Sequence, residues 1–407
     1  MPWQLKRGVH IHGGKLALNG KKRFDAGIKA LQAGRAVEAR SQFQASLDAG
    51  EDSAKVWLGF ALACVVEGDL SAAETGIDKV LSREGRNLRA LIVKGDLLAG
   101  RKDAQNAAAH YTLALRVAAT LPSVPTGIAA DLSRIQRHIQ QLNQQFQQHL
   151  FEQLASQGYQ RASAPSRFNE ALDLMMGVKL REEEVEPYPQ MPHVFYMPHM
   201  PYRTFYPNEY LPWMKSLEGA TDKIQRELQT LLAQNRARFT PYVHSGLGRA
   251  PSDDGELLDS DSWTSAHLWR DGEPDEDIMA CCPETVGLME SLPLTKIKGL
   301  APSVLFSKLN AGAAIPPHTG MLNVRLICHL PLIVPPECGL RVGQDERQVR
   351  LGTGWAFDDS INHEAWNRSN EDRIILLFDV WRPELNEEER LLITALLESA
   401  TSYRTVA

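Results

Sequence analysis

The sequence lacks any apolar run approaching the roughly 18 residues that a membrane-spanning helix needs. Its first twenty residues carry early positive charge but no apolar core, so no signal peptide is expected. The formal net charge of −6 argues against the basic surface that nucleic-acid binding requires. We therefore expect a cytoplasmic protein with no membrane span and no nucleic-acid partner.

Cysteine is also scarce, and its spacing is uninformative. The five cysteines are an odd number and show no short paired spacing of the zinc-site kind, so we interpret them as reduced thiols. The chain of 407 residues, with 43% hydrophobic and 23% charged residues, is long enough for two domains of ordinary globular composition.

The N-terminal third repeats itself. The segment that begins at Leu31 is echoed from Val65 and more loosely from Leu97, and Gly34 and Gly68 lie one 34-residue period apart. Small residues at turns and large ones at packing positions are typical of helix-turn-helix repeats. The pattern resembles tetratricopeptide repeats. It predicts either a surface that binds a peptide or protein partner, or a helical extension packed on the next domain or a dimerisation arm.

Further helices and a linker follow the repeats. The apolar spacing predicts a long capping helix over 130–156 and shorter helices over 169–179, 210–235 and 282–292. Proline-rich sequence before residue 212 indicates extended chain lying on a surface. We place a repeat domain at 20–157, a linker and extended segment at 158–200 and a second domain at 201–400. The acidic stretch 249–261 is interpreted as an exposed loop.

From residue 304 onward the apolar period becomes two. Short strands are expected at VLFSKLN, VRLICHLPLIV, GLRVG, RQVRL, GWAFDD and RIILLFDVW, and a helix capped by Asn386 ends the chain. This pattern predicts an antiparallel double-sheet barrel. The fold class is therefore α+β and multidomain, with a helical repeat domain before a jelly-roll, cupin-like domain.

Three polar residues stand out within the predicted barrel. His318 follows a Pro-Pro pair, His363 lies in a later predicted turn, and Arg373 comes ten positions after it. This spacing is typical of jelly-roll oxygenases, in which two imidazoles hold iron and the guanidinium holds an oxo-acid cosubstrate. The usual acidic ligand two residues after the first histidine is missing, because that position is Gly320.

Four motifs resemble the aspartyl/asparaginyl β-hydroxylase family of 2-oxoglutarate-dependent oxygenases. They are HTG at His318, NVRLICHL at 323–330, FDDSINHEAWN at 357–367 and FDVWRPEL at 378–385. The resemblance covers about residues 200 to 390. It implies a double-stranded β-helix, Fe(II) as the metal, and 2-oxoglutarate and O₂ as cosubstrates. A glycine in place of the acid is typical of this family, in which two histidines alone hold the iron.

The resemblance also implies roles for individual residues. His318 and His363 match the iron ligands, and Arg373 matches the residue that pairs with the distal carboxylate of 2-oxoglutarate. Ser307 matches a hydroxyl that assists this arginine, and His329 matches a residue near the other cosubstrate carboxylate.

One position departs from the animal members of the family, which carry an arginine where this chain has Ile327. On a strand, Arg325, Ile327 and His329 share one face, so we hypothesise that Arg325 supplies the missing charge. Asp358 and Asp359 lack the usual ligand spacing and are interpreted as residues that orient the imidazole of His363.

The implied reaction is hydroxylation of an unactivated C–H bond by a dioxygenase, with succinate and CO₂ as coproducts. The resemblance favours the β-carbon of an Asp or Asn residue in a peptide or protein. Three alternatives remain: hydroxylation of a lipid acyl chain or of a free or carrier-bound amino acid, a non-catalytic repeat scaffold with a degenerate barrel, and a metal-dependent cupin isomerase.

Overall fold

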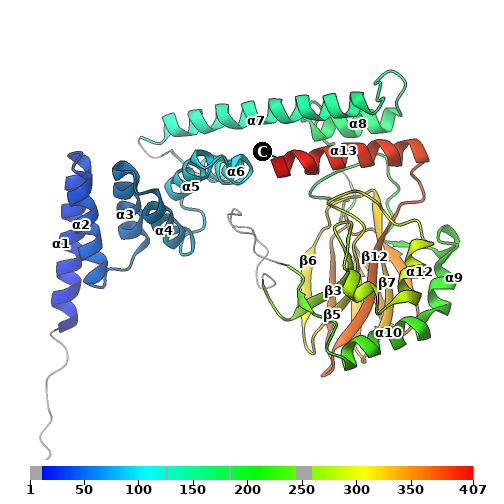
Figure 1. The fold of residues 1–407 in the computed structure, drawn as a ribbon. Coiled ribbons are helices and arrows are strands. Elements are labelled where there is room, and N and C mark those ends of the chain that lie inside the picture. Colours follow the sequence, from blue (N-terminus) through cyan, green and yellow to red (C-terminus); the bar gives the residue numbers. More distant parts are fainter. Residues whose placement is uncertain (1–11, 125–126, 183–184, 244–258, 407) are drawn as a thin grey trace, which may run out of the picture. The chain divides into compact units, whose positions relative to one another are not determined.

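The computed structural model describes residues 12–124, 127–182, 185–243 and 259–406 (Figure 1). Their contacts divide the described chain into two compact units, which meet in sequence between Gln144 and Gln145. The first unit is helical, and the second combines two β-sheets with helices.

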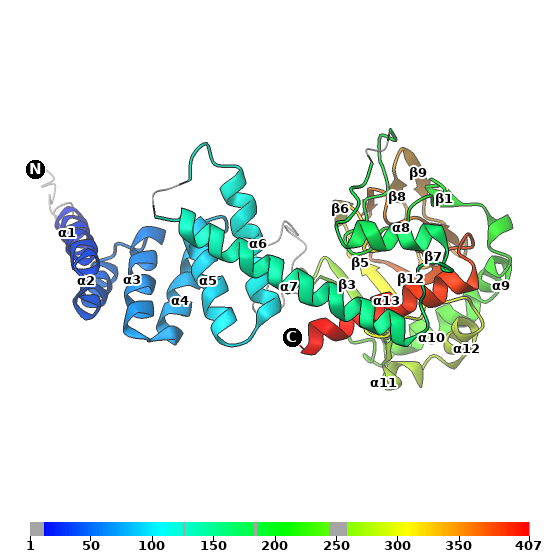
Figure 2. The ribbon, with the colours of Figure 1, turned by 90° about the horizontal axis from the view of Figure 1, so that it is seen from above.

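The helical unit is a row of helix hairpins. Within the described residues each helix packs chiefly on its neighbours in sequence, α1 on α2, α3 on α4 and α5 on α6 (Figure 2). The helices are α1 (His12–Gln32), α2 (Ala36–Asp48), α3 (Ala54–Glu67), α4 (Leu70–Leu81), α5 (Leu88–Gly100), α6 (Ala104–Ala119) and the first part of α7 (Ala129–Ser156). The predicted helical character is confirmed, and the assignment to tetratricopeptide repeats stays a prediction.

Glycines allow these hairpins to pack closely. A Cβ atom at Gly27 would lie 2.8 Å from the ring of Phe43, and one at Gly59 would lie 2.5 Å from the same ring. Tyr111 fills the same kind of space against Gly95, where a Cβ would lie 2.3 Å from its ring. Aromatic rings therefore occupy places where any larger residue would clash.

Helix α7 contributes to two separate cores. Ile135 is fully buried in the core of the helical unit, whereas Leu150 and Leu154 are fully buried in a core of the second unit. The compact units consequently divide inside this helix, earlier than the boundary at residue 157 expected from the sequence. The helix itself matches the predicted one.

The second unit contains two antiparallel sheets. The larger has the strand order β1-β10-β7-β12-β5-β3-β2, with β4 paired to β3, and the smaller has the order β6-β11-β8-β9. The strands are β1 (Phe205–Tyr206), β2 (Thr240–Pro241), β3 (Trp263–Arg270), β4 (Glu273–Pro274), β5 (Val304–Leu309), β6 (Ala314–His318), β7 (Arg325–Ile333), β8 (Cys338–Val342), β9 (Asp345–Gln348), β10 (Trp355–Phe357), β11 (His363–Asn367) and β12 (Arg373–Trp381).

Alternation along the strands separates two cores. On β12, Leu376 and Phe378 face the helices that cover the larger sheet, whereas Ile375 and Leu377 face the smaller sheet. The remaining helices are α8 (Ser166–Met175), η1 (Asn208–Tyr210), α9 (Met214–Gly219), α10 (Thr221–Ala233), α11 (Glu276–Met279), α12 (Pro283–Glu290) and α13 (Glu387–Val406). The expected double-sheet architecture is thus present, and its interior lies between the sheets.

Helix α13 begins where the sequence predicts a cap. The Asn386 side chain accepts a hydrogen bond from the Glu389 main-chain N–H at 2.9 Å, and the Glu389 carboxylate accepts one from the Asn386 N–H at 3.2 Å. This reciprocal pair is a capping box. Figure 1 shows α13 beside α8, which it contacts.

Several predicted elements differ in detail. The single helix expected over 210–235 is divided into α9 and α10 at Ala220, and α8 begins and ends earlier than the predicted 169–179. Strands β6 and β11, which carry the two histidines, were expected to be turns. Most of the acidic loop 249–261 lies outside the described residues.

None of the helices in the described ranges is long and apolar enough to cross a membrane. All five cysteines are free thiols.

Candidate active site

A cavity of about 240 Å³ lies between the two sheets. It is lined by all six residues singled out from the sequence, namely Ser307, His318, Arg325, His329, His363 and Arg373. Apolar side chains from both sheets, among them Ile315, Ile327, Leu340, Phe357 and Leu377, make up much of its remaining wall. The fold therefore brings these six residues, which span 66 positions of sequence, together around one largely apolar cavity.

The two histidines face each other across paired strands. His318 ends β6, His363 begins β11, and the two residues are register partners with ring centroids 4.1 Å apart. β6 is an edge strand, which explains how it tolerates the Pro-Pro pair before His318. The register shifts between His363 and Ala365, an irregularity of the kind that re-aims side chains near functional sites.

Main-chain carbonyls fix both imidazoles. His318 Nδ1 lies 2.8 Å from the carbonyl oxygen of Pro316, and His363 Nδ1 lies 3.0 Å from that of Ile361. A Nδ1–H donor to a carbonyl selects the tautomer in which Nε2 carries a lone pair. The two Nε2 atoms are then the candidate metal ligands.

Burial keeps these imidazoles neutral. It lowers the pKa of His318, and, together with the neighbouring His318, it lowers the pKa of His363 to about 3. Burial and the nearby Arg373 hold the pKa of His329 well below its usual value. Neutral imidazole is the form that binds metals, so the site suits a cation.

A carboxylate approaches the glycine that replaces the usual acidic ligand. A Cβ atom at Gly320 would lie 1.9 Å from Asp359 Oδ2, so Asp359 fills the space where a side chain at residue 320 would begin. Burial raises the pKa of Asp359 to about 7, and Arg325 opposes that rise. The facing turn thus brings an acid to the place where the HTG motif has none.

Arg325 lies at the cavity wall between two buried carboxylates. Its guanidinium nitrogens lie 3.7 Å from Asp359 Oδ2 and 3.8 Å from Asp379 Oδ2. Arg325, Ile327 and His329 all reach the cavity, which confirms that they share one face of β7. The role of Arg325 toward a cosubstrate stays a prediction.

Arg373 is buried without a counterion among the described residues. It is 2% exposed, its Nε atom has no hydrogen-bond partner there, and burial lowers its pKa to about 10. A buried guanidinium is costly unless an anion pairs with it. The cavity therefore has a place for an anionic group beside Arg373.

Trp263 is a cavity residue that the sequence reasoning did not select. Its indole Nε1–H donates to Ser307 Oγ at 3.0 Å, and Tyr242 stacks on its ring at a centroid distance of 4.0 Å. The signal available was its place at the start of an alternating strand, whose inward face was not known to reach Ser307. Trp263 orients the hydroxyl that lies two register positions from Arg373.

The described residues contain no cluster of three or more His, Cys, Asp or Glu side chains that could hold a metal by themselves. The two histidines are the metal donors that the cavity offers, and Asp359 lies on its wall without completing a set of three.

Comparison with known proteins agrees with this geometry. The family profile described as aspartyl/asparaginyl beta-hydroxylase matches residues 218–383. The human aspartyl/asparaginyl beta-hydroxylase is 29% identical over 188 residues, which are 46% of this chain and 24% of that protein. The ornithine lipid ester-linked acyl 2-hydroxylase of Rhizobium tropici is 29% identical over 194 residues, 46% of this chain and 64% of that protein.

This chain therefore spans about a quarter of the length of the human relative. Among solved structures, the cupin domain of Schizosaccharomyces pombe Cnp3 matches 30% of this chain and 66% of its own length, at 8% identity and a TM-score of 0.20. The profile match and the curated relatives together show that residues 218–383 of this chain are similar to the aspartyl/asparaginyl beta-hydroxylase family.

Proposed function

We propose that this protein is an Fe(II)- and 2-oxoglutarate-dependent dioxygenase that hydroxylates an unactivated C–H bond. The observation that carries the proposal is the joint presence, on one cavity, of two neutral facing imidazoles and a buried guanidinium that has no counterion among the described residues. The two imidazoles suit a divalent metal, and the guanidinium suits a carboxylate.

Each residue has a proposed role. His318 and His363 would hold Fe(II) through Nε2, and Arg373 with Ser307 would hold the distal carboxylate of 2-oxoglutarate. A guanidinium matches a carboxylate with two parallel hydrogen bonds, which an ammonium cannot do. His329 and Arg325 would lie toward the other carboxylate.

Bound Fe(II), with 2-oxoglutarate and O₂, supplies the oxidant for C–H hydroxylation, and succinate and CO₂ are the coproducts. The chain itself holds and orients the reactants. Ile315, Leu340 and Leu377 give the cavity between Arg373 and the histidines an apolar wall, which would limit competing water around bound reactants. No side chain has to transfer a proton in the hydroxylation step, so the site needs no acid–base pair.

The proposed substrate is the β-carbon of an Asp or Asn residue in a peptide or protein, the chemistry named by the human relative. The name of the Rhizobium relative favours a second candidate, hydroxylation of a lipid acyl chain. A protein partner on the helical hairpins would fit the peptide alternative and stays a proposal.

Anaerobic titration of the protein with Fe(II) and 2-oxoglutarate tests the proposal. We expect a weak visible charge-transfer band in the wild type, its loss in His318→Ala and its weakening in Arg373→Ala. Succinate formation in the presence of Asn- or Asp-containing peptides, compared with acyl lipids, then separates the two substrate classes. Absence of the band in folded wild-type protein would contradict the proposal and favour a non-catalytic scaffold.

A further inference from the structure

A segment that precedes the family match joins the turn after His318 to the turn before His363. Residues 190–195, here called the strap, belong to the proline-rich chain before β1, whereas the family profile begins at residue 218. The strap runs beside the turn at 358–361, which leads into His363, and beside the turn at 319–322, which follows His318.

The first half of the strap binds the turn before His363. The Met191 main-chain N–H donates to the Ser360 carbonyl at 2.6 Å, and Gln190 forms a β-bridge with Ile361. The Gln190 side-chain amide also donates to Asp358 Oδ2 at 2.7 Å. These contacts lie two to five residues before His363, and they include Ile361, whose carbonyl oxygen orients the His363 ring.

The second half of the strap binds the turn after His318. The His193 N–H donates to the Gly320 carbonyl at 3.0 Å, and the Val194 N–H donates to the Met321 carbonyl at 2.9 Å. The His193 ring lies 3.1 Å from the hydroxyl of Thr319. Among the described strands, β6 lies at the edge of its sheet. The main-chain carbonyls just after His318 therefore accept their hydrogen bonds from the strap and not from another strand.

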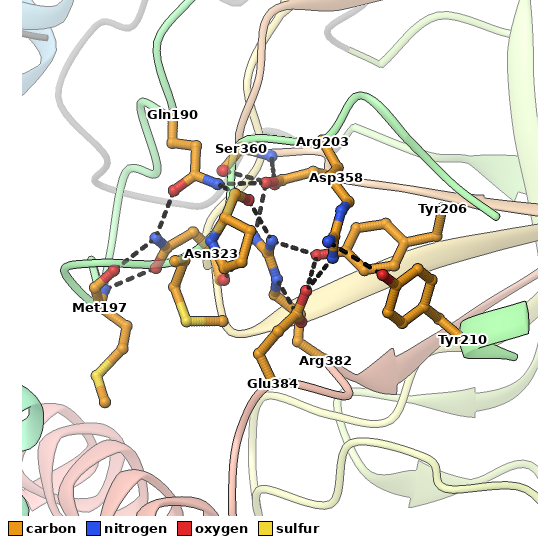
Figure 3. Close-up of polar contacts among 12 residues, drawn as sticks. Gln190, Met197, Arg203, Tyr206, Tyr210, Asn323, Asp358, Ser360, Arg382 and Glu384 are labelled. Carbon is orange, nitrogen blue, oxygen red and sulfur yellow. Dashed lines mark hydrogen bonds and ion pairs between the residues drawn. The ribbon is translucent and has the colours of Figure 1, made fainter.

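A buried polar network fixes the strap in place (Figure 3). The amide of Asn323 bonds to Gln190 Oε1 at 3.0 Å and to both main-chain groups of Met197. Arg382 donates to Asp358 Oδ2 at 2.8 Å and to the Pro201 carbonyl at 2.7 Å. Asn323, Asp358 and Arg382 are each 0% exposed and Gln190 is 3% exposed, so these bonds are shielded from competing water.

We infer that the strap is a positioning element of the metal site, with Gln190 and the Met191 N–H as its main contacts to the His363 turn. It sets the separation of the two imidazoles because the same six residues bind both turns. The inference rests on the proposed function, since it takes His318 and His363 to be metal ligands. Outer contacts of this kind typically change metal affinity by about 10- to 100-fold.

The sharpest test removes one main-chain donor. Met191 is 52% exposed, so Met191→Pro deletes the N–H that bonds Ser360 while Met191→Ala keeps it as the matched control. We would titrate each full-length protein with Co(II) in the presence of 2-oxoglutarate and record its visible spectrum. The expected result is at least about 10-fold weaker Co(II) binding and an altered spectrum for Met191→Pro, with Met191→Ala within about twofold of wild type.

Two glutamine-to-alanine variants test the side-chain contacts of the strap in the same way. Gln190→Ala, which loses the side-chain bonds to Asp358 and Asn323, is compared with Gln225→Ala, which loses a glutamine bond to the Leu332 carbonyl away from the cavity. Gln190→Ala should weaken Co(II) binding about 10-fold and Gln225→Ala should not. Folded Met191→Pro and Gln190→Ala proteins with wild-type Co(II) affinity and spectrum would overturn the inference. Wild-type protein that binds no Co(II) would instead overturn the proposed function beneath it.

Discussion

Gly320 and Asp359 lie so close that a side chain at the first position would overlap the second. A Cβ at Gly320 would be 1.9 Å from Asp359 Oδ2, and the Gly320 N–H donates to the Asp359 main-chain carbonyl at 2.6 Å. The glycine of the HTG motif therefore admits a carboxylate from the facing turn. The acid of this site comes from the second histidine's turn and not from the first.

The first prediction concerns Gly320→Ala. The added methyl group must displace Asp359, which also breaks the contact between Asp359 and Arg325, so we expect a loss of about 1–3 kcal/mol in unfolding free energy and weakened metal binding. Gly287→Ala is the control, because that glycine lies exposed in α12 with open space around it. Denaturant unfolding and Co(II) titration measure the two effects. Wild-type values for Gly320→Ala would contradict the proposed contact.

Arg373→Met should separate stability from cosubstrate binding. Methionine removes a buried charge that has no counterion among the described residues, so we expect the ligand-free protein to be unchanged or stabilised by about 1 kcal/mol. The rise in melting temperature on adding 2-oxoglutarate should disappear. Arg350→Met, at an exposed position, is the control and should keep that rise. A retained rise in Arg373→Met would argue against the carboxylate site.

Much of this site could be predicted because its determinants are local in sequence. The period-two strands, the capping Asn386 and the family motifs around His318, His363 and Arg373 can each be identified within a few residues. Strands β6 and β11 are not predicted from the sequence. Pro316 and Pro317 make the sequence of β6 resemble a turn, and β11 is the strand that pairs with it. The pairing that forms both strands joins residues 45 positions apart.

Other parts of the site depend on contacts with no local signal. Gln190 looks like an ordinary polar residue of a loop, yet it is buried, and its side chain bonds both Asn323 and Asp358. Trp263 lies on β3, and its bond to Ser307 depends on the register of β3 against β5. An alternating sequence pattern predicts which side chains of a strand share a face, but it does not predict which strand pairs with it or in which register.

Trp263 and Ser307 should act as a coupled pair. Trp263→Phe removes the indole donor and Ser307→Ala removes its acceptor, so each should weaken 2-oxoglutarate binding by about 5-fold, which corresponds to one neutral hydrogen bond. The double variant should lose less than the sum of the two single losses. Isothermal titration measures the affinities, with Trp269→Phe on the same strand but outside the cavity as control. Additive losses would show that the bond does not organise the site.

Arg325→Ala should be costly to stability. It leaves the buried carboxylates of Asp359 and Asp379 without their shared cation, so we expect a loss of about 3–5 kcal/mol. If Arg325 also supplies the charge absent at Ile327, 2-oxoglutarate affinity should fall in Arg325→Ala and be partly kept in Arg325→Lys. Titration of the folded variants decides this, and unchanged affinity in Arg325→Ala would refute the role toward the cosubstrate.

Acid should destabilise the metal-free protein through its cavity histidines. Burial lowers the pKa of His363 to about 3, whereas the unfolded chain has the ordinary value near 6.5. Between these values the unfolded state binds more protons, so the contribution of His363 is fully present above about pH 6.5 and is lost as pH falls toward 3. The slope from this one group is at most about 1.4 kcal/mol per pH unit. His318 and His329 act in the same direction.

Asp359 acts in the opposite direction, because its raised pKa of about 7 makes the folded state bind a proton first as the pH falls. A comparison of variants is therefore needed to isolate the histidine. His363→Asn cannot titrate, so its unfolding free energy should decline less than that of the wild type between pH 7 and pH 5, with both proteins free of metal. Arg350→Met, which leaves the cavity intact, should follow the wild-type slope. If the unfolding free energies of His363→Asn and the wild type fell equally with pH, His363 would be solvated in the folded protein. Burial would then not be what keeps its imidazole neutral and able to bind a metal.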